Sequence, residues 1–200
     1  DTPDTPDKKY DSKSVYIDGY KDGRFKPDKD MSRAEVAKVL AYALTSGFDE
    51  EEYTNNFRDV DEKAWYSNIL GYMKEINAIE GYPDGKYNPD KAVTRAEFAK
   101  IISKIDGLKE SKNNKFKDVD NNHWAKKYIE SVAEKGYIIG YPDGSFKADN
   151  EITRAEVVAI VNRLLGKQLK SYKDKKDLKV FKDMNKEHWA YWDIIAATNK

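Results

Sequence analysis

The chain has 200 residues, of which 39% are hydrophobic and 36% are charged, and its 36 basic side chains balance 36 acidic ones. This balance argues against binding to nucleic acid or to an anionic membrane surface, because both need a basic excess. The sequence contains no long apolar run and no cysteine, so it predicts no membrane insertion and excludes disulfides and thiolate metal sites.

The chain opens with an acidic stretch, Asp1 to Asp7, that prolines interrupt. This stretch lacks the basic and apolar regions of a signal peptide. Its composition is typical of a stiff, extended linker. Residues 1–14 are therefore predicted to be a linker that joins upstream cargo domains to the rest of the chain.

Residues 15–45 resemble the second half of a repeat unit. A turn motif at residues 19–23 precedes the sequence Ser-Arg-Ala-Glu at residues 32–35. Val36 and Val39 then begin an apolar stripe at helical spacing. The elements that precede such a turn elsewhere in the chain are missing here.

Residues 57–105 form a whole unit. Its motifs are Phe-Arg-Asp-Val at residues 57–60, Trp65, Gly-Tyr-Pro-Asp-Gly at residues 81–85 and Thr-Arg-Ala-Glu at residues 94–97. Apolar residues follow Trp65 at helical spacing, and a second stripe follows the last motif. The proline and glycine of the third motif favour a tight turn between the two helices.

Residues 116–165 repeat all four motifs 59 positions later. Residues 181–200 then carry only the first half of the pattern, with Phe181-Lys-Asp183 and His188-Trp189. The chain thus reads half, whole, whole and half. We expect the two terminal halves to meet and complete a third unit, which closes a pseudo-threefold ring.

These repeats predict a mainly α fold. Each unit reads as helix, tight turn and helix, and one such unit is too small to cover its own apolar face. The units must therefore pack on each other in a single module that spans residues 15–200.

One hydroxyl residue precedes the second helix of each of the three units, with a glutamate three positions later. This spacing is typical of a capping box, in which both side chains accept free backbone N–H groups, and it is worth about 1 kcal/mol per cap. We interpret these residues as structural. They are Ser32 with Glu35, Thr94 with Glu97 and Thr153 with Glu156.

Arg33, Arg95 and Arg154 occupy the first turn of these helices, where the helix dipole disfavours a cation. Two interpretations explain their recurrence. Each arginine forms an ion pair with a nearby aspartate or with the capping glutamate, or each forms an anion site together with the free N–H groups of the helix start.

The repeated aromatic residues also have two interpretations. Tyrosine and tryptophan rings can pack against the CH faces of sugars. Tyr20, Tyr82 and Tyr141 stand on the turns, where exposure is expected, and are equally compatible with structure and with binding. For the tryptophans that start the first helices we favour core anchoring over ligand contact; these are Trp65, Trp124 and Trp189.

Other chemistry finds little support in the sequence. His123 and His188 occupy one repeat position that holds Ala64 in the other copy, which argues against catalysis there. The turns also fail as EF-hand calcium loops, because in the register that starts at Glu80 the third and twelfth positions are Tyr82 and Lys91. No nucleotide-binding loop or other cofactor motif occurs, so we expect no cofactor, no metal and no enzyme activity.

The four motifs in fixed order, twice complete and twice halved, resemble the S-layer homology (SLH) domain family, and the likeness covers nearly everything from Val15 onward. The resemblance implies a pseudo-trimer with a central helical bundle and three lobes. It also implies location at the bacterial cell surface and binding of cell-wall polymer in grooves between repeats. The implied ligand is a secondary cell-wall polysaccharide with a pyruvylated amino sugar, or a modified peptidoglycan.

On this basis the sequence predicts non-covalent anchoring, in which the repeated arginines clamp a ligand carboxylate and the aromatic rings select the sugar. Loss of Arg95 and Arg154 together is expected to abolish wall binding and to leave the fold intact. A helical module for protein interaction or S-layer assembly, without glycan contact, is the alternative. The predicted glycan-binding residues are Arg33, Arg95, Arg154, Tyr20, Tyr82, Tyr141, Trp65, Trp124 and Trp189.

Overall fold

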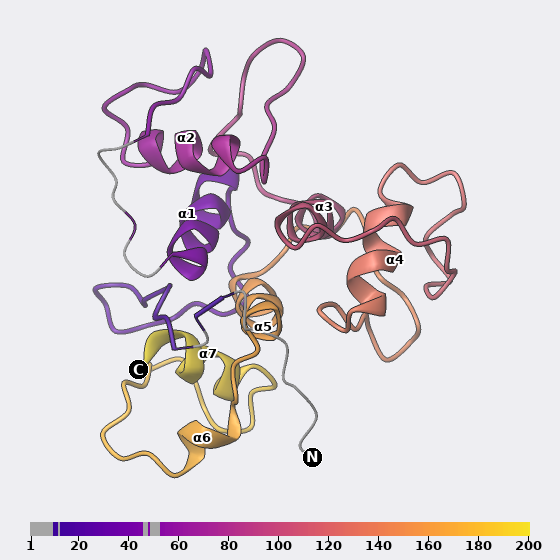
Figure 1. Cartoon of the computed structure of the whole chain (residues 1–200). Coiled ribbons are helices and arrows are strands. Elements are labelled where there is room, and N and C mark those ends of the chain that lie inside the picture. The colour runs from indigo at the N-terminus through magenta and orange to yellow at the C-terminus, as the bar shows by residue number, and fades with distance from the viewer. Residues whose placement is uncertain (1–9, 12, 46–47, 49–52) are drawn as a thin grey trace, which may run out of the picture. The chain divides into compact units, whose positions relative to one another are not determined.

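A computed structural model describes residues 10–11, 13–45, 48 and 53–200, so most of the predicted linker lies outside the described residues. The described residues are mainly helical, which confirms the predicted mainly α class (Figure 1). They also include two isolated β-bridges. Within them, no helix has the length and apolar character needed to span a bilayer. The helices are α1 (Arg33–Leu44), α2 (Ser67–Glu75), α3 (Arg95–Ile105), α4 (Lys126–Glu134), α5 (Arg154–Leu165), α6 (Lys170–Lys173) and α7 (Tyr191–Thr198).

The chain divides into two compact units. Of the described residues, the first unit comprises those within 10–29, 39–48 and 153–200, and the second comprises those within 30–38 and 53–152. In the second unit α3 packs against α4, and in the first α5 and α6 both pack against α7 (Figure 1). The pseudo-threefold arrangement of the repeats stays a prediction.

The three predicted capping boxes are confirmed. At the start of α3, the Thr94 hydroxyl accepts the backbone N–H of Glu97, and the Glu97 carboxylate accepts the N–H of Thr94. Ser32 with Glu35 and Thr153 with Glu156 make the same reciprocal bonds. Each helix therefore begins at the arginine that follows its hydroxyl residue.

The residues just before these caps form a closed triangle of backbone hydrogen bonds in the second unit. The N–H of Val93 donates to the carbonyl of Met31 at 3.0 Å, and the N–H of Ile152 donates to Val93 at 2.8 Å. Met31 closes the triangle by donating to Ile152 at 3.1 Å. All three side chains are buried, so this triangle joins equivalent positions of three repeats in a dry environment.

The Phe-x-Asp motif of each repeat binds the loop that follows the turn motif. The carboxylate of Asp59 accepts the backbone N–H groups of Tyr87 at 2.7 Å and of Asn88 at 2.8 Å. Phe57 lies against Gly81, where a Cβ atom would come within 2.7 Å of the ring, so the close approach requires glycine. Two further aspartates make the same pair of bonds: Asp118 to Phe146 and Lys147, and Asp183 to Phe25 and Lys26.

The last of these contacts joins the two ends of the sequence within the first unit. Besides the Asp183 bonds, the N–H of Lys182 donates to the carbonyl of Gly23 at 2.9 Å. Arg58 and Lys117 make the equivalent bond to Gly85 and Gly144 in the whole repeats. The two terminal half-units thus share the backbone contacts that hold each whole unit together.

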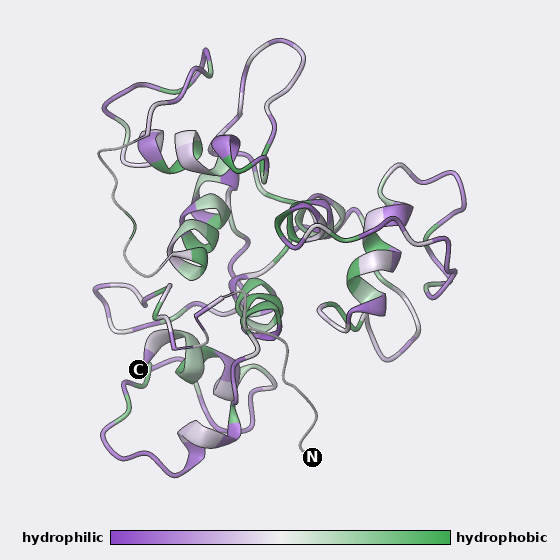
Figure 2. Ribbon diagram, viewed as in Figure 1, coloured by the Kyte–Doolittle hydropathy of each residue, from purple (hydrophilic) through white to green (hydrophobic). Residues whose placement is uncertain are grey.

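The core of the first unit is built around α5, of which ten of twelve residues are buried. Figure 2 shows most of this helix as hydrophobic, whereas α4 is divided between hydrophobic and hydrophilic residues. One polar network crosses this core. The Tyr16 hydroxyl donates to Asn162 Oδ1 at 2.5 Å, and Asn162 Nδ2 donates to Asp193, so helices α5 and α7 are joined to the N-terminal half-unit.

Candidate functional site

Each repeated arginine reaches from the start of its helix to the turn region of another repeat. The Nε atom donates to a backbone carbonyl five residues after the turn tyrosine. The guanidinium group also lies over the ring of that tyrosine and over a second ring, an arrangement that favours a cation. The three sets are Arg33 with Tyr87 O (2.8 Å) over Tyr82 and Tyr87, Arg95 with Phe146 O (2.8 Å) over Tyr141 and Phe146, and Arg154 with Phe25 O (2.9 Å) over Tyr20 and Phe25.

Arg33 differs from the other two in its access to solvent. It is half-buried, whereas Arg95 and Arg154 are only 5% and 6% exposed. Their side chains hold backbone carbonyls and support aromatic rings, so their removal is expected to disturb the fold. The burial of Arg95 and Arg154 thus argues against the expectation from the sequence that the fold survives their loss. Arg33 is the better position for a variant that tests binding alone.

The contacts of Arg33 leave its positive charge in place. Besides Tyr87 O, its Nη2 atom donates to the carbonyl of Glu80 at 3.1 Å. Among the described residues, the guanidinium group contacts these two carbonyls and the rings of Tyr82 and Tyr87. A carbonyl accepts an N–H group without cancelling the charge, so the guanidinium can still attract an anion.

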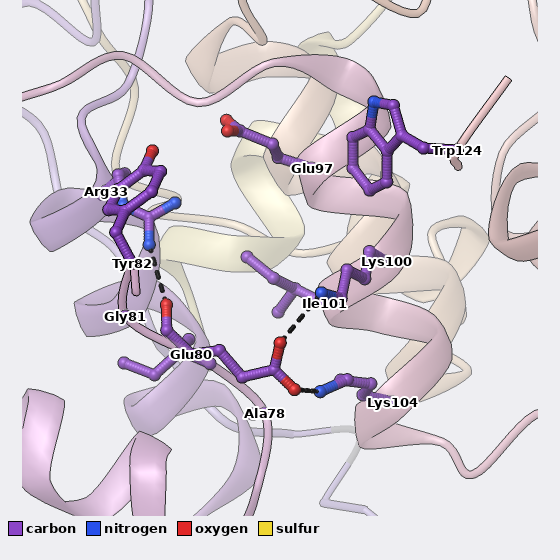
Figure 3. Close-up of a pocket in the computed structure, with 11 residues that line it drawn as sticks. Arg33, Ala78, Glu80, Gly81, Tyr82, Glu97, Lys100, Ile101, Lys104 and Trp124 are labelled. Carbon is purple, nitrogen blue, oxygen red and sulfur yellow. Dashed lines mark hydrogen bonds and ion pairs between the residues drawn. The ribbon is translucent and has the colours of Figure 1, made fainter. Parts of the chain in front are cut away.

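Arg33 lines a pocket of about 230 Å³, here called the Arg33 pocket (Figure 3). It lies wholly within the second unit and is formed by the start of α1, the segment before the turn, one face of α3 and Trp124. Three predicted site residues meet there: Arg33, Tyr82 and Trp124. The remaining lining residues are Ala78, Ile79, Glu80, Gly81, Glu97, Lys100, Ile101 and Lys104.

Three basic side chains and two acidic side chains line this pocket. Lys100 and Lys104 of α3 both form ion pairs with the carboxylate of Glu80, and their hydrogen bonds lower the pKa of Glu80 to about 2. Glu97 is engaged by its capping box and lies 3.6 Å from the ammonium group of Lys91. The hydrogen bond from Lys91 to the Tyr82 hydroxyl, together with Glu97, raises the pKa of that lysine.

Sequence reasoning missed Glu80, Lys100 and Lys104. A signal was present, since Lys100 and Lys104 are four residues apart on a predicted helix and therefore lie on one face. Their place beside Arg33 could not be read from the sequence, because it depends on which repeat lies against α3.

The favoured interpretation of the tryptophans is wrong. Trp65, Trp124 and Trp189 are 52%, 53% and 60% exposed, so they do not anchor the core. Each stands two residues before its helix instead of inside it, and this loop position turns the ring outward. Trp124 lines the Arg33 pocket, whereas Trp65 and Trp189 are not among its residues.

Each of the three exposed tryptophan rings has a basic or polar neighbour. The ammonium group of Lys38 lies 5.3 Å from the centre of the Trp65 ring, and His123 stacks on Trp124 at 5.8 Å. His188 stacks on Trp189 at 5.9 Å. A large exposed ring with a polar neighbour can contact the apolar face of a polar ligand.

Comparison with known proteins extends these observations. The chain is 39% identical over 195 residues to a cellulosome-anchoring protein of Acetivibrio thermocellus. The aligned residues cover 90% of this chain and 41% of that protein. It is 35% identical over 196 residues to cell surface glycoprotein 1 of the same organism, of which it covers 8%. An exoglucanase, XynX, from that organism is 30% identical over 161 residues, which cover 76% of this chain and 14% of the enzyme.

The chain thus spans less than half the length of these relatives. The family model of the S-layer homology domain matches residues 12–37, 56–99 and 115–158, which overlap the first half-unit and both whole units. The chain therefore belongs to the S-layer homology domain family, which confirms the resemblance seen in its motifs and the predicted location at the bacterial cell surface.

Proposed function

We propose that this chain anchors proteins at the cell surface by binding an acidic secondary cell-wall polysaccharide without a covalent bond. The similarity to a cellulosome-anchoring protein and to a cell surface glycoprotein supports a role in anchoring. The observation that carries the choice of an acidic ligand is the Arg33 pocket, where a guanidinium group held by carbonyls lies near two lysines and an exposed tryptophan.

The chemistry of this pocket suits a carboxylated sugar. Arg33 can offer its remaining N–H groups to a carboxylate, such as that of a pyruvate ketal on an amino sugar. The ring of Trp124 offers a flat apolar surface to the CH groups of the sugar, and Tyr82 lies against the guanidinium group. We assign the chain a binding role and no catalytic one.

The repeated design supports retention by several weak sites. Arg95 with Tyr141 and Arg154 with Tyr20 repeat the contacts of Arg33 with Tyr82. One polymer that engages more than one such site gains affinity through effective concentration, without a single tight pocket. We propose that cargo domains linked to this module are held at the wall in this way.

The decisive experiment is sedimentation of the protein with purified cell-wall material before and after chemical removal of pyruvate. The wild-type protein should sediment with native wall and remain in solution with depyruvylated wall. Arg33→Gln should weaken binding by about tenfold, because it removes a charged donor worth about 1.5 kcal/mol or more. Arg58→Gln is the matched control, since Arg58 is exposed in the same unit and is absent from the pocket lining.

The same experiment separates the alternatives. Equal binding to both wall preparations would contradict recognition of pyruvate and would favour modified peptidoglycan or another wall polymer. Binding to neither preparation, by a protein that melts cooperatively, would favour a module for protein interaction or S-layer assembly.

A further inference from the structure

Glu80 occupies the basic side of the Arg33 pocket. Its Oε2 atom lies 2.9 Å from the ammonium group of Lys100, and its Oε1 atom pairs with Lys104 (Figure 3). The two lysines are one helical turn apart on α3, so a single carboxylate bridges both. This arrangement is the one that a carboxylate from a ligand would adopt at the same two lysines.

The side chain of Glu80 can leave without disturbing the backbone. Arg33 holds Glu80 through its carbonyl group, at 3.1 Å, and not through its carboxylate. The Glu80 side chain is 57% exposed, whereas Lys100 and Lys104 are 31% and 26% exposed, so water screens the two ion pairs from the side of the carboxylate. The carboxylate can therefore exchange with another anion at the two lysines, and the main chain beside Arg33 stays in position.

A second cavity gives the displaced side chain a polar surface. Glu80 also lines this cavity, of about 420 Å³, together with Asn56, Lys74 and Asn77. Glu80 thus stands between two cavities of the same unit, each of which contains an ammonium group. An anionic ligand in the Arg33 pocket would leave the carboxylate room on the other side.

This combination of charges belongs to one repeat only. At the repeat positions equivalent to Glu80 the sequence has Asp18 and Ile139. Ala159 replaces Lys100 in one copy, and Tyr42 replaces Lys104 in the other. The glutamate with two lysines therefore distinguishes the Arg33 pocket from its counterparts.

We propose that Lys100 and Lys104 form a second anion subsite beside Arg33, and that Glu80 occupies this subsite until the carboxylate of an acidic saccharide displaces it. This inference rests on the proposed function, because it assigns a second contact for the same class of ligand. Glu80 is then an internal competitor that makes the pocket selective for anionic sugars, since a neutral sugar cannot replace it on the two lysines.

Calorimetric titration with a synthetic pyruvylated amino sugar, and with its methyl ester as the uncharged control, tests the subsite. Glu80→Gln should bind the acidic sugar about threefold more tightly, because the internal competitor for the two lysines is removed. The double variant Lys100→Gln/Lys104→Gln should bind it more weakly. Adding Glu80→Gln to that double variant should change nothing further, since the lysines no longer attract the carboxylate.

Glu110 and Lys127 provide the matched control, because they form an exposed ion pair in the same unit and are absent from the lining of the Arg33 pocket. Glu110→Gln and Lys127→Gln should leave the affinity unchanged. The inference is overturned if Glu80→Gln fails to tighten binding, or if its gain persists without the two lysines.

Its failure can be told apart from failure of the proposed function. If the wild-type protein binds the acidic sugar and Arg33→Gln loses it, while Glu80→Gln has no effect, only the second subsite is wrong. If the folded wild-type protein binds neither this sugar nor native cell wall, both proposals are wrong.

Discussion

The carboxylate of Asp183 accepts the backbone N–H of Phe25 at 2.8 Å, although 158 positions separate the two residues in the chain. The equivalent pairs in the whole repeats, Asp59 with Tyr87 and Asp118 with Phe146, are only 28 positions apart. The same type of contact thus joins neighbouring segments within each whole repeat and joins the two terminal half-units to each other.

Asp183→Ala is therefore expected to destabilise the protein as much as an internal substitution of the same kind. It leaves two backbone N–H groups without their carboxylate and should lower the free energy of unfolding by about 1–3 kcal/mol. Urea denaturation of Asp183→Ala beside Asp118→Ala measures this effect. A fully stable Asp183→Ala protein would show that the terminal contact contributes nothing to the fold.

Arg95 is expected to matter more for stability than Arg33. Arg95 is nearly buried, and its Nε atom donates to the carbonyl of Phe146 at 2.8 Å. Arg95→Gln should lower the free energy of unfolding by about 2–3 kcal/mol, because a buried charged donor and its ring contacts are lost. Arg33→Gln should cost less, since Arg33 is half-buried. Thermal denaturation of the two variants compares them, and the reverse order would refute this assignment.

The exposed Trp124 should contribute to binding and little to stability. Trp124→Ala is expected to change the free energy of unfolding by less than about 0.5 kcal/mol, as surface substitutions usually do. It should also weaken wall binding in the sedimentation experiment. Trp192 serves as the contrast, because it packs against the cluster of Tyr172, Tyr191 and Ile195. Trp192→Ala should destabilise the protein, and a similar loss in Trp124→Ala would mean that Trp124 is structural.

The burial of Lys167 should make the stability of the protein depend on pH. It is 7% exposed, it donates to the carbonyl of Ser14 at 2.7 Å, and burial lowers its pKa to about 8. The ordinary value of 10.5 applies to the unfolded chain, so between about pH 8 and 10.5 the unfolded state binds more protons than the folded state. The contribution of this lysine to stability must therefore rise with pH across that window.

The variant Lys167→Met removes this titration. From pH 7 to pH 10, the free energy of unfolding of the wild type should rise relative to that of the variant by an amount on the order of 2 kcal/mol. Urea denaturation of both proteins at the two pH values measures the shift. A difference that stays constant would show that Lys167 titrates normally.

Local features of the fold could be predicted from the sequence because they depend on residues a few positions apart. The capping boxes link Thr94 with Glu97 and Thr153 with Glu156, and the spacing of three residues at a helix start places each pair within hydrogen-bond reach. The repeat of four motifs likewise predicted the mainly α fold and the family. Even here the start of α2 was misplaced, because Trp65 lies in the loop before Ser67.

The sequence by itself thus determined the repeats, the helix starts and the presence of an unusual arginine at each start. Only the tertiary structure decided what surrounds those arginines: Arg33 meets Tyr87 and Glu80, 54 and 47 positions away. It also decided that Lys100, Lys104 and Trp124 share one pocket. The physical reason is that these contacts depend on which repeat lies beside which, and residue spacing along the chain carries no record of that choice.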